Sequence, residues 1–69
     1  MLYSHLVQAE VHIAAGEDLI ARQQVLLSRL RARADDTALA EDVLRHMRIS
    51  QMLHVADRDR LRKLLEQDA

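Results

Sequence analysis

The chain lacks cysteine, proline, tryptophan and phenylalanine, and it has one glycine, Gly16, and one aromatic residue, Tyr3. Without cysteine there are no disulfides, no cysteine-zinc sites and no thiolate chemistry. The scarcity of aromatic, glycine and proline residues argues against a β-sheet fold, which needs such residues in its strands and turns. The 69 residues are 49% hydrophobic and 30% charged, a balance typical of one small globular or coiled-coil domain over residues 1–69.

The chain also lacks a large excess of basic or acidic residues, because ten basic and eleven acidic residues leave a net charge of −1. We therefore expect neither a nucleic acid nor a membrane surface to be the main partner. No apolar run approaches the ~20 residues of a membrane span. The first residues lack a basic region followed by an apolar core, so we expect no signal peptide and a cytoplasmic location.

A heptad pattern is present throughout the first half of the chain. Spacings that alternate between four and three residues predict one long helix over about residues 2–34. Leu19 and Leu26 widen the apolar stripe on one flank, and a wide stripe suits a helix with two neighbours. We call the residues at the a and d positions of this heptad pattern the seam of the helix. They are Leu2, Leu6, Ala9, Ile13, Gly16, Ile20, Gln23, Leu27, Leu30 and Ala34.

A cluster of turn residues, Asp35, Asp36 and Thr37, follows this pattern. Asp36 or Thr37 can cap a second helix, so we expect a turn at about 35–36 and a helix over about 37–67. A short turn makes the two helices antiparallel neighbours. The second seam is Ala40, Leu44, Met47, Gln51, His54, Arg58, Leu61 and Leu65, widened by Leu39, Val43, Leu53 and Leu64.

Stripes of this width are too broad for two helices to bury against each other alone. Chains this small usually need a metal, a disulfide or a second copy. Because cysteine is absent, we expect a second copy to bury the rest of each stripe. The predicted fold is all-α, an antiparallel helical hairpin that dimerises into a four-helix bundle. The predicted dimer core is Leu6, Ile13, Gly16, Ile20, Leu27, Leu44, Met47, His54, Leu61 and Leu65.

Polar residues interrupt the centre of the seam. Folding the chain about Asp35 and Asp36 places Gly16 opposite His54, which predicts that His54 fills the space left by the glycine. Gln23, Gln51 and His54 are then expected to fix the register of the bundle. The alternatives are a ligand slot at Gly16 or a functional polar pocket.

A further set of residues is spread along both helices: Ala9-Glu10, Ile13, Gly16-Glu17, Ile20-Ala21, Gln23, Leu30, Asp36-Thr37, Ala40-Glu41, Leu44, Leu53-His54, Arg58 and Leu61. In these residues the chain resembles a group of short, uncharacterised bacterial two-helix proteins. That group usually has a glycine in the turn where this chain has Ala34, and it implies the hairpin shape but no activity. The topology looks like that of ROP, a dimeric helical hairpin that binds RNA, at the level of fold only.

Candidate metal ligands are few. His54 and Asp57 share a helix face, and the assumed pairing brings His12 near them, in a combination that suits zinc. The alternative is a packed histidine bonded to Asp57 or to a carbonyl group, and the Glu-x-x-His motif of di-iron bundles is absent. We therefore expect no metal and no cofactor.

A second apolar stripe lies on nearly the opposite side of the first helix from its seam. We interpret it as a possible contact with a further helix, from a second copy or from another protein. The arginines are interleaved with acidic residues, which favours a salt-bridged surface over an RNA-binding face. The stripe consists of Val7, Val11, Ala14, Ala21 and Val25.

No nucleophile and base stand at catalytic spacing, and there is no glycine-rich phosphate loop, so we expect no enzyme. Three hypotheses follow. The first is a homodimeric bundle that acts through protein–protein contacts as an adaptor or regulator. The second is an RNA-binding hairpin dimer, and the third is a metal-binding bundle with ligands from His12, His54 and Asp57.

Overall fold

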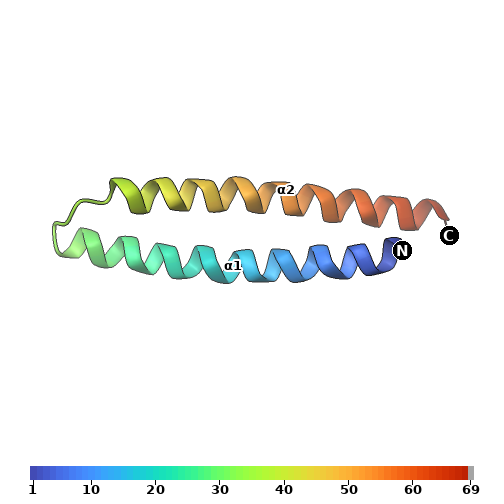
Figure 1. The fold of residues 1–69 in the computed structure, drawn as a ribbon, viewed down its shortest axis with the longest axis horizontal. Coiled ribbons are helices and arrows are strands. Elements are labelled where there is room, and N and C mark those ends of the chain that lie inside the picture. The colour runs from blue at the N-terminus through green and yellow to red at the C-terminus, as the bar shows by residue number, and fades with distance from the viewer. Residues whose placement is uncertain (69) are drawn as a thin grey trace.

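The computed structural model describes residues 1–68, with side chains described for residues 1–67. Helix α1 (Leu2–Ala32) and helix α2 (Ala38–Asp68) pack side by side in opposite directions. Figure 1 shows the two chain ends together at one end of the molecule and the connection at the other. The described residues contain no strand. The predicted all-α antiparallel hairpin is confirmed.

The hairpin is a long and thin body. Its extents are 55 × 14 × 13 Å and its radius of gyration is 16.0 Å, whereas a compact domain of this length has about 11 Å. Each helix therefore has one neighbour and exposes most of its circumference. In the part of the chain that the structure describes, neither helix combines the length and the apolar composition that a bilayer crossing requires.

Helix α1 ends two residues earlier than the pattern predicts, at Ala32. The N–H of Asp35 donates to the carbonyl of Leu30 at 2.9 Å, and the N–H of Ala34 donates to that of Arg31 at 3.1 Å. These two bonds form a Schellman motif, in which the residue after the cap adopts the left-handed conformation. Ala34 takes this place with φ 57°. The connection therefore spans residues 33–37 and is longer than the predicted turn.

Replacing Ala34 with glycine should stabilise the hairpin by about 0.5–1 kcal/mol. Left-handed φ brings the alanine Cβ against the backbone, and glycine has no such clash. Ala32→Gly is the matched control, because Ala32 lies in the last helical turn and should lose about as much. Urea denaturation of both variants tests the prediction. Equal destabilisation by both would contradict the left-handed cap.

Helix α2 begins at a side-chain cap. Asp36 accepts a hydrogen bond at its Oδ1 from the N–H of Ala38 at 3.0 Å, which satisfies one of the free donors of the first turn. The acidic Glu41 lies in this first turn, and the basic Arg31 lies in the last turn of α1. Both charges complement the helix dipoles. Asp36 thus performs the capping role that the sequence assigned to either Asp36 or Thr37.

The seam of α1 faces α2, as its spacing predicts. The α1 residues that are buried or half-buried all belong to the predicted seam, and every other α1 residue is exposed. Burial therefore follows the heptad pattern over the whole helix, because both have the same period. These residues are Leu2, Leu6, Ala9, Ile13, Gly16, Ile20, Gln23, Leu27 and Leu30.

The core lies between the two helices of one chain. Leu27, Ala40 and Leu44 form a buried cluster near the turn, and Ile20 and Leu30 pack against it. The residues predicted as a dimer core are thus partly or fully shielded within one hairpin, and the contribution of a second copy stays a prediction. The buried residues among those described are Ala9, Ile13, Leu27, Ala40, Leu44 and Leu61.

Candidate functional site

Two glutamines cross the interface and bond to the opposite backbone. Gln51 of α2 donates its Nε2 hydrogen to the carbonyl of Ile13 at 2.8 Å. Gln23 of α1 donates its Nε2 hydrogen to the carbonyl of Ala40 at 3.0 Å. Each bond joins groups on different helices and tolerates no axial sliding, because hydrogen bonds weaken steeply away from their preferred geometry. These contacts support the register role predicted for the polar seam residues.

Gly16 provides the space for one of these bonds. A Cβ at this position would lie 1.9 Å from Gln51 Oε1 and 2.9 Å from its Cδ. The prediction that His54 fills this space is therefore wrong: Gln51, about one turn earlier in α2, occupies it. The cause is an axial offset of about one turn from the assumed pairing. Gln51 Oε1 is buried and accepts no hydrogen bond from the described residues.

His54 contacts another histidine instead. The ring centroids of His12 and His54 lie 5.3 Å apart with 37° between the planes. His5, Asp57 and Arg60 line the same groove towards the chain ends. Asp57 accepts a hydrogen bond from Arg60 Nη2 at 2.6 Å. The structure thus brings the three candidate metal ligands to one groove, yet the described residues contain no group of three or more that could hold a metal ion.

Most arginines have an acidic neighbour. Six of the nine arginines form ion pairs with aspartate or glutamate. Exposed pairs of this kind add little stability, but they reduce the charge available to a phosphate backbone. The pairs are Arg22–Asp18, Arg31–Glu41, Arg45–Asp42, Arg58–Asp59, Arg60–Asp57 and Arg62–Glu10.

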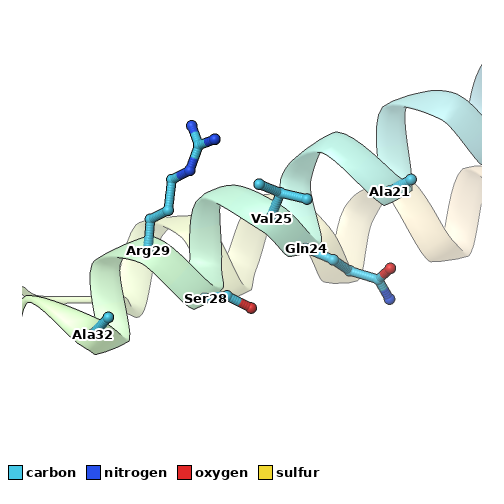
Figure 2. Close-up of a pocket in the computed structure, with 6 residues that line it drawn as sticks. All are labelled: Ala21, Gln24, Val25, Ser28, Arg29 and Ala32. Carbon is cyan, nitrogen blue, oxygen red and sulfur yellow. The ribbon is translucent and has the colours of Figure 1, made fainter.

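The second stripe of α1 lies on its outer surface. Figure 2 shows Ala21 and Val25 projecting from α1 beside Ser28 and Ala32, with α2 behind the helix. The six residues drawn in Figure 2 line a shallow depression, and all of them belong to this one helix. The five predicted stripe residues, Val7, Val11, Ala14, Ala21 and Val25, are all exposed. Their contact with a further helix stays a prediction.

The two long edges of the hairpin differ in chemistry. On one edge, Arg31 Nη2 lies 3.1 Å from Glu41 Oε1 near the turn. Towards the open end of the same edge, Arg62 Nη2 lies 3.2 Å from Glu10 Oε1. Each of these four residues directly follows a seam residue, which places them on the same flank. We call this flank the charged edge, defined by Glu10, Arg31, Glu41 and Arg62.

The opposite edge carries leucines. Leu19, Leu26, Leu39 and Leu53 each directly precede a seam residue, so they lie on the other flank. By the same rule the Asp57–Arg60 ion pair lies on this flank, towards the chain ends. Their exposed fractions are 49%, 44%, 77% and 67%. Leu19 borders a groove of about 210 Å³ that Ser50 lines from α2. We call these four residues the leucine edge. The spacing of these leucines already indicated an apolar flank, because they widen both seams, but only the packed hairpin places them on one side.

No protein-family model, no curated protein and no solved structure matches this chain. The hairpin shape that the resemblance to bacterial two-helix proteins implies is present in the structure. Membership of the chain in that group stays a prediction.

Proposed function

We propose that the protein is a homodimeric, non-enzymatic four-helix bundle that acts through protein–protein contacts, as an adaptor or regulator. The observation that carries this proposal is the exposed surface of the hairpin, 5353 Å². A compact monomer of this size exposes about 4,400 Å². The excess, about 950 Å² per chain, is close to the ~800 Å² that each partner buries in a typical stable complex.

The composition of this surface supports the same proposal. Large apolar side chains remain half exposed or more in both helices, among them Leu39 at 77% and Met52 at 70%. Exposed apolar surface that is contiguous marks interaction sites in soluble proteins. The grooves between the helices are open and shallow. Among the described residues, no hydrogen bond joins a nucleophilic side chain to a basic one. A binding role therefore fits this surface better than catalysis.

Sedimentation equilibrium should give twice the mass of one chain at micromolar concentration. The melting temperature should rise with protein concentration, because association stabilises the folded state by mass action. A monomer with a melting temperature independent of concentration would overturn the proposal. The RNA-binding alternative predicts a gel shift that weakens steeply with salt, and metal analysis of the purified protein tests the third hypothesis.

A further inference from the structure

We propose that the second copy of the chain docks on the leucine edge, Leu19, Leu26, Leu39 and Leu53. This inference rests on the proposed homodimer and assigns its interface. The four leucines come from both helices, so a partner placed there touches two helices at once. Such an arrangement converts two hairpins into four mutually packed helices.

The groove beside Leu19, one of these leucines, is suited to an apolar partner. It runs between the helices. Its lining includes Gly16, Leu19, Met47 and Ser50, together with His12, Gln51 and His54. None of its lining residues is an acid, an arginine or a lysine. A partner side chain that enters the groove therefore displaces water without stripping solvent from an ion pair, whose desolvation would cost free energy.

The charged edge is a poorer docking surface for the same reason. Its groove near the turn is lined by Arg31, Glu41, Arg45 and Arg48 around the apolar residues of the interface. Arg31 and Glu41 already form an ion pair there at 3.1 Å. An apolar partner on this side would bury four charges, which is unfavourable unless each finds a partner.

The outer stripe of α1 presents smaller apolar side chains than the leucine edge. Its members are valines and alanines from one helix, and Asp18 interrupts it at the centre and pairs with Arg22. The depression on the outer stripe is shallow and lined by one helix, whereas the groove at the leucine edge lies between two helices. Hot spots of binding energy concentrate where side chains fill such hollows.

Leu53 and Met52 provide a matched pair of test positions. They are neighbours in α2 with similar exposure, 67% and 70%, yet Met52 lines the groove on the charged edge. Leu53→Glu should raise the dimer dissociation constant at least about tenfold, because it buries an unpaired charge. Met52→Glu should leave that constant within about twofold, because the added charge stays in water. Sedimentation equilibrium over a concentration series measures both.

Cysteine footprinting gives a readout that needs no disruption of the interface. The chain has no cysteine, so L53C and M52C each carry a single thiol. Above the dissociation constant, a charged thiol reagent should modify L53C at least about tenfold more slowly than it does in dilute protein. The rate for M52C should not change with concentration.

The outcomes separate this proposal from the one it rests on. A wild-type chain that is monomeric overturns both the dimer and its interface. A wild-type dimer that survives Leu53→Glu, with unprotected L53C, overturns the leucine edge alone. Dissociation by Val25→Glu but not by Leu53→Glu would assign the interface to the outer stripe of α1 instead.

Discussion

Leu61→Ala should lower the free energy of unfolding by about 2–4 kcal/mol. Leu61 is the most buried of the described core residues, with 3% of its surface exposed. Its truncation removes apolar burial and leaves a cavity that a long two-helix interface collapses only in part. The total stability of a chain of this length is about 3–10 kcal/mol, so the variant should be largely unfolded well below the melting temperature of the parent. Circular dichroism during urea denaturation, at one fixed protein concentration, measures this loss.

Two further variants test where the core lies. Leu27→Ala removes a side chain from the buried cluster near the turn and should cost a similar amount. Val11→Ala changes a residue that is 59% exposed and should cost less than about 1 kcal/mol. A loss at Val11 as large as that at Leu61 would show that the outer surface of α1 is buried in the assembled protein.

Gly16→Leu should destabilise the hairpin by about 1–3 kcal/mol. Even the Cβ of a new side chain would meet Gln51 Oε1 at 1.9 Å, so the amide must leave its place and lose its hydrogen bond to Ile13. Overpacking costs about 1–3 kcal/mol and the lost bond about 1 kcal/mol, whereas the gain in helix propensity returns about 1 kcal/mol. Thermal denaturation and the dispersion of the NMR spectrum test stability and packing together.

Gly16→Ala is the matched control for this effect. The methyl group also displaces the Gln51 amide, but the helix gains about as much as the lost hydrogen bond costs, so stability should stay within about 1 kcal/mol of the parent. Gly16→Leu combined with Gln51→Ala should recover much of the loss, because the leucine then occupies the vacated space. A Gly16→Leu variant as stable and as well dispersed as the parent would show that Gly16 does not face α2.

The heptad seam could be read from the sequence because it depends on local geometry. An α-helix has 3.6 residues per turn, so residues three and four positions apart share a face whatever packs against it. The α1 residues from Leu2 to Leu30 that are shielded are those of the predicted seam. The position of the turn was likewise signalled by Asp36, whose side chain caps α2.

The end of α1 was harder to predict, since it depends on one residue in an unusual conformation. Ala34 continues the seam spacing, and alanine is the best helix former. In the structure it adopts φ 57° and closes the Schellman motif. The left-handed conformation is costly for an alanine. It occurs next to a tertiary contact, because Leu30 packs on the buried cluster near the turn.

Two properties of the hairpin were decided by its tertiary structure alone: the axial register and the chemistry of its edges. A slide of about one turn replaces one seam residue by the next, so His54 and Gln51 satisfy the periodicity opposite Gly16 equally well. The choice between them depends on two contacts of the Gln51 amide. It fits into the space beside Gly16, and it donates a hydrogen bond to the carbonyl of Ile13.

The sequence by itself determined two long amphipathic helices, their seams and the site of the turn, because each follows from short-range spacing and capping. Only the packed hairpin brought the widening leucines of both helices to one flank and the Glu10–Arg62 and Arg31–Glu41 pairs to the other. The reason is that a flank of a hairpin consists of residues far apart in the chain. Their proximity depends on the register between the helices, which the periodicity of either helix does not encode.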